Sequence, residues 1–446
     1  MPTEPLTHAR VLRIAVPIVL SNATIPILGA VDTAVIGQLG QAAPMGAVAM
    51  GAVILASFYW IFGFLRMGTT GLVAQARGAG DRAEVAAVLI RALIIGLGAG
   101  AVFVAAQNVL FWAAFALAPA SPAVEGFART YLALRIWGAP ATIALYAIIG
   151  WLIATERTRS VLLVQVLMNG LNVALDLWFV LSLGWGVTGV AIATLIAEYS
   201  GLALGLWLCR DALGWAALRD RARIFDAARL ARMLAVNGDI MVRSVVLQGA
   251  FTAFVFLGAG LGDVTLAANQ VLMLFLQFTA YALDGFAFAA EALVGAAVGA
   301  GLRSGVRQAA LLASQWGIGG AVALALGFWL AGPGIIDLMT TAPEIRLLAR
   351  AYLPWLAVAP VIGIAAWMLD GIYIGATWTR PMRNAMLLAV GIYGLAVALL
   401  VPLFGNHGLW AALMVLNIAR AVTLGWRYRG LEAGVQSQSA RPVPTA

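Results

Sequence analysis

Long apolar stretches separated by short polar loops run through almost the whole chain. Most are as long as or longer than the roughly 20 residues that a helix needs to cross a bilayer. Their positions predict twelve membrane-spanning helices, near residues 11–37, 46–76, 86–117, 131–155, 160–183, 186–208, 229–257, 264–299, 306–332, 351–376, 382–405 and 408–428. Several stretches exceed the minimum length, which indicates tilted helices or helices that extend beyond the bilayer.

Composition supports this reading. Of the 446 residues, 63% are hydrophobic and 10% are charged, whereas soluble proteins carry roughly 25% charged residues. Too few polar side chains remain to cover a water-facing surface. We therefore expect an all-α polytopic membrane protein whose main surroundings are the lipid bilayer.

The basic residues indicate the orientation. All 27 are arginine, and they cluster in alternate loops, around residues 77–82, 157–159, 219–229, 303–307, 380–383 and 427–429. This is the positive-inside pattern, and it argues against a nucleic-acid partner despite the net charge of +8. It predicts that both termini are cytoplasmic. The lysine-free, alanine- and arginine-rich composition suits a bacterial inner membrane.

The two halves of the sequence repeat at an offset of 221 residues. Matching pairs are Val73 and Val294, Gly78 and Gly299, Arg82 and Arg303, Tyr131 and Tyr352, and Gly150 and Gly371. With six spans each, the halves keep one membrane orientation, as in parallel-repeat transporters with a cavity between two lobes. The predicted divisions are an N-lobe (1–208), a cytoplasmic linker (209–228), a C-lobe (229–430) and a disordered cytoplasmic tail (431–446).

One acid lies deep in the first span. Asp32 stands in the run Val31–Gly37, surrounded by apolar residues. A carboxylate at such depth costs about 2.5–3.5 kcal/mol on insertion scales, and intramembrane acids are functional by default. The equivalent position in the second half is Ala253, so the acid is not a repeated scaffold feature. We interpret Asp32 as a group that binds and releases a proton.

A second acid, Asp176, follows Asn172 by four residues, which places both side chains on one helix face. Tyr131 opens the fourth span and Thr194 lies midway along the sixth. If these groups converge with Asp32, two carboxylates would share a desolvated site that holds a proton near neutral pH. The alternative is two separate acids satisfied by local amides and water.

Two prolines, Pro17 and Pro26, fall in the first span. Each removes a helical hydrogen bond and weakens the helix locally. A helix that bends there and carries a titratable acid would serve as a switch, and a static kink is the alternative.

The second half has its own buried charges. Asp239 and Arg243 are four residues apart, and this spacing predicts an intrahelical ion pair. Asp284 and Glu291 are seven apart on one face, either to bind cations or to pair with Arg66 or Arg243. Asp370 is a further acid of this half.

Motifs of catalysis are missing from the sequence. There is no phosphate-cradling loop, no metal-spaced cluster of histidine and cysteine, and no Ser/His/Asp set at plausible depth. We therefore expect a protein that is not an enzyme and needs neither a metal nor an organic cofactor.

Three runs together resemble the multidrug and toxic compound extrusion (MATE) family, in its DinF-like branch. They are Val31–Gly37, the run from Asn237 to Arg243, and the run from Phe278 to Glu291. The resemblance extends over nearly the whole chain, from about residue 9 to residue 429.

This resemblance implies two six-helix lobes in a V shape and cation-driven antiport of amphipathic, often cationic drugs. The first-helix acid of the family matches Asp32, and its bending proline matches Pro17. Its first-lobe proton network matches the residues Tyr131, Asn172, Asp176 and Thr194.

Members of the NorM type carry a sodium-linked glutamate in the seventh helix, where this chain is apolar near Val245. This departure favours protons over sodium as the coupling ion, although sodium binding in the first lobe stays open. We expect a monomer that exports small amphipathic molecules. The alternatives are a lipid-linked precursor flippase of related architecture, a sodium-coupled exporter, and an intramembrane enzyme or receptor subunit.

Overall fold

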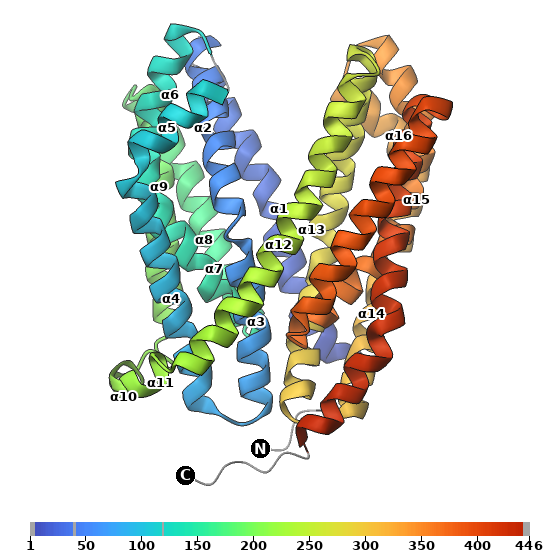
Figure 1. Ribbon diagram of the computed structural model, residues 1–446. Coiled ribbons are helices and arrows are strands. Elements are labelled where there is room, and N and C mark those ends of the chain that lie inside the picture. The colour runs from blue at the N-terminus through green and yellow to red at the C-terminus, as the bar shows by residue number, and fades with distance from the viewer. Residues whose placement is uncertain (1–4, 39–41, 118–119, 440–446) are drawn as a thin grey trace. The chain divides into compact units, whose positions relative to one another are not determined.

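The computed structural model describes the backbone of residues 5–38, 42–117 and 120–439 (Figure 1). The side chains of these residues are described too, except those of 25–30, 32–33, 117 and 436–439. Every regular element within these ranges is a helix. The predicted all-α fold class is therefore confirmed.

The helices follow the predicted apolar stretches closely. The first half contains α1 (His8–Gly37), α2 (Ala42–Trp60), α3 (Gly63–Gly78), α4 (Arg82–Ala105), α5 (Gln107–Leu117), α6 (Pro122–Arg135), η1 (Ile136–Gly138), α7 (Ala139–Ala154), α8 (Thr158–Asp176), η2 (Leu177–Ser182) and α9 (Gly186–Leu208). Two short helices, α10 (Trp215–Arg219) and α11 (Arg221–Ile224), form the linker. The second half contains α12 (Ala227–Ala259), α13 (Asp263–Gly299), α14 (Arg303–Met339), α15 (Pro343–Gly375) and α16 (Thr379–Ser439).

Ten helical segments within the described residues are long and apolar enough to cross a membrane. These ten do not include α1, and they take α16 as one segment. Yet α16 has a non-helical backbone at Gly405 (φ 54°, ψ −129°), where two helices meet at a kink. With α1 added and α16 divided at Gly405, the helices are consistent with the predicted twelve spans.

The duplication in the sequence recurs in the packing. A Cβ atom added at Gly150 would lie 2.4 Å from the carbonyl oxygen of Arg66, and one added at Gly371 would lie 2.6 Å from that of Ala287. Arg66 and Ala287 are themselves 221 residues apart. Each half therefore makes the same close helix contact at equivalent glycines, where any side chain would collide with a neighbouring backbone.

Contacts divide the chain into two compact units, each built from separated segments. Unit 1 comprises Met1–Val19, Ala74–Gly80 and Arg232–Ala446, and unit 2 comprises Leu20–Val73 and Asp81–Ala231. Unit 1 has a core of large apolar side chains that includes Phe254, Leu272 and Trp410. Both α1 and α3 pass from one unit to the other, so the units do not correspond to a single cut in the sequence. The predicted lobe boundaries at residues 208 and 229 stay predictions.

The tail differs from its prediction. We expected disorder over residues 431–446, but α16 continues to Ser439, and Leu431 and Val435 are buried. These two side chains are four residues apart and so lie on one helix face. Their burial shows that this last stretch of α16 has an apolar face, which its polar overall composition did not indicate. Residues 440–446 lie outside the described part of the chain.

Candidate functional site

The first predicted coupling residue, Asp32, lies in the backbone of α1. Its side chain and that of Pro26 lie outside the described part of the structure. Pro17 is described and is buried in α1, two residues before the point at which the helix passes from unit 1 to unit 2. The structure therefore identifies the helix that carries Asp32 without giving the contacts of its carboxylate.

Polar groups gather on one face of α8. Asn172 and Asp176 are 1% and 0% exposed, and the Asn172 side-chain amide donates to Thr194 Oγ1 of α9 at 3.1 Å. Thr194 in turn donates to the carbonyl of Val190 at 2.9 Å. Asn172 and Thr194, two of the four residues that the resemblance places in a first-lobe network, are thus in direct contact. Asp176 lies one helical turn beyond Asn172 on the same face.

Two features of α8 near this face were missed in the sequence. At Asp176 the helix gives way to η2, a π-helical segment, and such segments are frequent at functional sites. One turn before Asn172, the Asn169 amide donates to Thr24 Oγ1 of α1 at 2.6 Å. The polar face of α8 is therefore hydrogen-bonded to α9 on one side and to α1, the helix of Asp32, on the other.

Tyr131 of α6 is buried at 4% exposure, and its ring packs directly on Gly51 of α2. A Cβ atom at Gly51 would lie 2.5 Å from the ring, so this contact requires glycine. No hydrogen bond between Tyr131 and the Asn172–Thr194 pair is seen among the described residues. The structure places Tyr131 in the core of unit 2.

A buried ion pair next to Tyr131 had no assigned role in the sequence. Arg135 of α6 donates to both carboxylate oxygens of Glu198 in α9, at 2.7 and 2.9 Å. Gly138 lies so close that an added Cβ would be 2.0 Å from Glu198 Oε2. The detectable signal was an arginine and an acid in two different apolar spans, because charges at such depth are usually paired.

In the second half, the predicted ion pair between Asp239 and Arg243 is wrong. Asp239 accepts hydrogen bonds from Thr379 Oγ1 at 2.9 Å and from Arg383 at 2.6 Å. Arg243 instead pairs with Asp370 of α15. Spacing of i, i+4 brings two side chains within reach, but here α15 and α16 supply closer partners.

Asp370 has a second arginine partner, Arg420 of α16, which also donates to Asn417. Sequence reasoning missed Arg420, although it is an arginine within the last apolar span. Glu291 is 2% exposed in α13, and Asp284 of the same helix is half-buried. Of the alternatives for these two acids, pairing with Arg243 is not seen in the described part of the structure, because its guanidinium pairs with Asp370; cation binding and pairing with Arg66 stay predictions.

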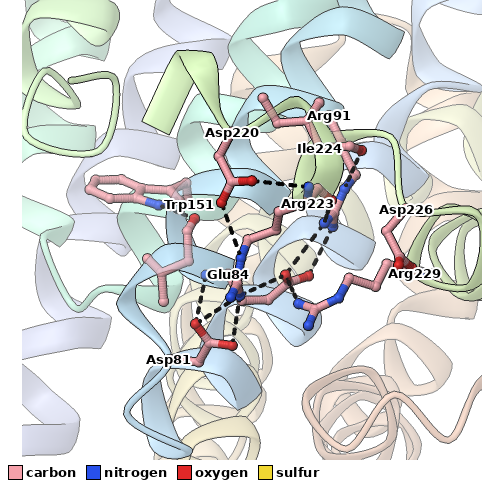
Figure 2. A network of polar contacts seen from close by, with 10 residues as sticks. Asp81, Glu84, Arg91, Trp151, Asp220, Arg223, Ile224, Asp226 and Arg229 are labelled. Atoms are coloured by element: carbon pink, nitrogen blue, oxygen red, sulfur yellow. Dashed lines mark hydrogen bonds and ion pairs between the residues drawn. The ribbon is translucent and has the colours of Figure 1, made fainter. Parts of the chain in front are cut away.

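A third polar cluster, which we call the linker network, holds the linker against α4 (Figure 2). Buried Arg91 donates to Glu84 at 2.9 Å and to the carbonyls of Arg223 and Ile224 at 2.8 and 2.9 Å. Arg229 also pairs with Glu84. The network holds the linker against α4 through both side-chain and backbone hydrogen bonds.

Asp81 belongs to the same network and caps α4 (Figure 2). Partial burial acts to raise the pKa of this carboxyl, but a hydrogen bond from the Glu84 N–H and the contact with Arg223 outweigh it. The net effect is a pKa below the ordinary value of an aspartate. Asp81 therefore stays ionised near neutral pH and is structural.

Among the described residues, no group of three or more histidine, cysteine, aspartate or glutamate side chains is arranged to hold a metal ion. The chemistry that the candidate site offers is thus that of carboxylates, amides and hydroxyls. Such groups can bind a proton or a cationic ligand.

Comparison with known proteins gives consistent results. The MatE family model matches residues 17–178 and 240–400. The chain is 41% identical to DNA damage-inducible protein F of Escherichia coli (strain K12) over 420 residues, which cover 93% of this chain and 91% of that protein. It is 26% identical to a probable multidrug resistance protein NorM of Rhizobium meliloti (strain 1021), with 95% and 93% of the two chains covered.

Solved structures show the same fold. An outward-facing conformation of a multidrug resistance MATE family transporter of the MOP superfamily superimposes with a TM-score of 0.86 at 20% identity, covering 96% of each chain. The Vibrio cholerae MATE transporter VcmN in the bent form gives a TM-score of 0.87 at 19% identity, covering 96% of this chain and 98% of that one. At these identities the likeness establishes the architecture.

Proposed function

The chain belongs to the MatE family, and from this premise we propose that it is a secondary active exporter of amphipathic, often cationic compounds in exchange for protons. The family is one of membrane transporters, so the chain is a multi-pass membrane protein and not an enzyme. Proton coupling and the acids that perform it are the parts of the proposal that need testing.

The observation that carries the proposal is the buried polar face of α8. Asp176 is fully buried in a membrane span, one turn from the Asn172–Thr194 hydrogen bond. An acid that is kept at such depth despite its cost is a functional site by default. Its helix is also bonded to α1 through Asn169 and Thr24, so a change of charge at Asp176 acts on the helix that carries Asp32.

The proposed cycle uses the charge of these two acids. When the cavity is open to the cytoplasm, ionised Asp32 and Asp176 attract a cationic amphiphile, and its apolar part is buried. After the cavity opens outward, protonation neutralises the acids and weakens binding, so the compound leaves. A ligand shifts such an equilibrium only through different affinities for the two states, and protonation supplies that difference.

Bending of α1 would connect protonation to release. Pro17 has no N–H to bond the carbonyl of Arg13, one turn earlier, so α1 is weakened there. Two residues later the helix changes from unit 1 to unit 2. A bend at Pro17 would therefore let the part of α1 that carries Asp32 move separately from the part before it.

The second half supports protons over sodium as the coupling ion. The carboxylate of Asp370 already accepts hydrogen bonds from Arg243 and Arg420. Its negative charge is compensated by these two guanidinium groups, so it does not attract a further cation. Val245 is apolar where NorM-type relatives are expected to carry a glutamate. One charge moving through 100 mV contributes about 2.3 kcal/mol, so each proton can drive a substantial gradient of substrate.

The test is transport of a fluorescent cation, ethidium, into proteoliposomes driven by a pH gradient, with sodium or choline as the salt. We expect transport in either salt and its loss in Asp32→Asn and Asp176→Asn. Asp211→Asn is the matched control, because Asp211 is an exposed linker acid paired with Arg157.

Three outcomes would overturn the proposal. Undiminished proton-driven transport by Asp32→Asn would exclude the coupling role of that acid. Transport that requires a sodium gradient would instead support the sodium-coupled exporter, and translocation of a lipid-linked precursor without ethidium transport would support the flippase.

We further propose that the protein acts as a monomer in a bacterial inner membrane with both termini in the cytoplasm. The alternation of arginine-rich loops supports this orientation. Reporter fusions at the two termini and at loop 183–186 test it: the termini should report a cytoplasmic location and the loop an external one.

A further inference from the structure

One buried carboxylate in unit 1 accepts hydrogen bonds from two arginines. Arg243 of α12 and Arg420 of α16 both donate to the same oxygen, Oδ2, of Asp370 in α15. The three residues are 7%, 2% and 6% exposed. They form a compact cluster, the Arg243–Asp370–Arg420 cluster, inside membrane-spanning helices.

The cluster carries more positive than negative charge. Arginine stays protonated in proteins, so two guanidiniums and one carboxylate leave an excess of one positive charge. Asp239 does not balance it, because its two oxygens accept from Thr379 and Arg383. Asp370 and Arg243 are charged neighbours of Arg420.

The cluster also has unused hydrogen-bonding capacity. Within the described part of the chain, the Nε–H groups of Arg243 and Arg420 are buried without an acceptor, and Oδ1 of Asp370 is buried without a donor. A buried donor that lacks an acceptor costs about 1–3 kcal/mol, and more when it is charged. Both the excess charge and the free N–H groups would be satisfied by one negatively charged acceptor.

This arrangement is specific to the second half. At the 221-residue offset, Asp370 corresponds to Ile149 and Arg243 to Asn22. The cluster is therefore not a scaffold element that both repeats require. Asp370 lies five residues from the end of α15 at Gly375, which is about 7–8 Å along a helix.

We propose that the Arg243–Asp370–Arg420 cluster binds a small monovalent anion, either an inorganic ion or the carboxylate of a larger molecule. A guanidinium presents its N–H groups in a planar fork that matches a carboxylate and also binds spherical anions. The inference depends on these three residues and not on the proposed drug–proton exchange.

The experiment measures the thermal unfolding temperature of the purified full-length protein in detergent, without substrate or pH gradient. Chloride and acetate are titrated separately against methanesulfonate at constant ionic strength, with choline replacing sodium in a parallel series. We expect a saturable rise in unfolding temperature with at least one anion, in both cation series. Chloride alone identifies an inorganic ion, and a stronger effect of acetate identifies a carboxylate ligand.

Variants of the cluster should respond in opposite directions. Arg420→Gln removes the excess charge and should abolish the response to anions, and Arg243→Gln should do the same if Arg420→Gln fails to fold. Asp370→Asn adds a second excess charge and should lower the half-saturating anion concentration about tenfold or more. Arg383→Gln is the matched control, since it removes an arginine outside the cluster, and its response should be retained.

Three results would overturn the inference. They are an unfolding temperature of the natural protein that does not respond to either anion, an equal response in Arg420→Gln and Arg243→Gln, and a response that disappears when choline replaces sodium. Because no transport is measured, failure here leaves the proposed exporter function standing, and loss of that function leaves anion binding intact.

Discussion

Gly299, the last residue of α13, packs directly on the backbone of Gln75 in α3: an added Cβ atom would lie 1.9 Å from the Gln75 carbonyl oxygen. The reciprocal contact exists too, since a Cβ at Gly78 would lie 2.0 Å from the carbonyl oxygen of Ala296. Gly78 and Gly299 are equivalent in the two repeats, and so are Gln75 and Ala296. The ends of α3 and α13 therefore meet in a pseudo-symmetric contact that only glycine permits.

Gly299→Val should force α3 and α13 apart. Overpacking a tight contact costs about 1–3 kcal/mol, which shifts a conformational equilibrium about 5–150-fold away from states that contain the contact. We expect faster hydrogen–deuterium exchange in residues 74–80 and slower substrate transport. Gly319→Val is the control, because an added Cβ at Gly319 meets nothing within 4 Å. Unchanged exchange in Gly299→Val would contradict the role of this contact.

The Arg135–Glu198 ion pair should be essential for the stability of unit 2. Both side chains are buried, and removal of one partner of a buried pair costs about 3–5 kcal/mol because the other charge is left uncompensated. Glu198→Gln should therefore lower the thermal unfolding temperature clearly.

The double variant Arg135→Gln/Glu198→Gln should recover part of that loss, since no unpaired charge remains. Arg129→Gln breaks the exposed pair with Glu125 and should cost no more than about 1 kcal/mol. Equal effects of Glu198→Gln and Arg129→Gln would show that the buried pair contributes little.

Features that depend on local pattern could be predicted from the sequence. Apolar length predicted the spans, and the 221-residue offset predicted equivalent glycines that do make equivalent contacts. The family resemblance grouped Asn172 with Thr194, and the two side chains share a hydrogen bond. The resemblance to the MATE family is also confirmed, by the MatE match and the relatives.

Ion pairs for which a charged residue has several possible partners could not be predicted from the sequence. The i, i+4 spacing predicted an ion pair between Asp239 and Arg243. It contains no information about acids on other helices, and in the structure Arg243 pairs with Asp370. Arg135 and Glu198 are 63 residues apart in the sequence. Their pairing can be recognised only once the packing of α6 on α9 is known. Pairing across helices requires the tertiary structure.

The Asn172–Thr194 hydrogen bond should affect the pH dependence of transport. Thr194→Val keeps the shape of the side chain but leaves the buried Asn172 amide without its acceptor, at a cost of about 1–3 kcal/mol. The α8 face beside Asp176 would then rearrange. We expect the pH at half-maximal transport to shift in Thr194→Val and to stay unchanged in Thr194→Ser, which retains the hydroxyl. Identical pH profiles of transport for both variants would show that this hydrogen bond plays no part in proton coupling.

Asp81 should make the attachment of the linker sensitive to acid. Its carboxylate accepts from Arg223 at 3.0 and 3.1 Å, and its folded-state pKa lies below the ordinary 3.8. A lowered pKa means that the contact contributes fully above the ordinary value and is lost as the pH falls through the folded value. A spin label at Ala222→Cys, in a Cys209→Ser background, should therefore gain mobility only below about pH 4, near the ordinary range for aspartate. In Asp81→Asn the label should already be mobile at pH 7, with a smaller change in acid. A label equally immobile at pH 7 in both proteins would mean that the other linker contacts suffice without this ion pair.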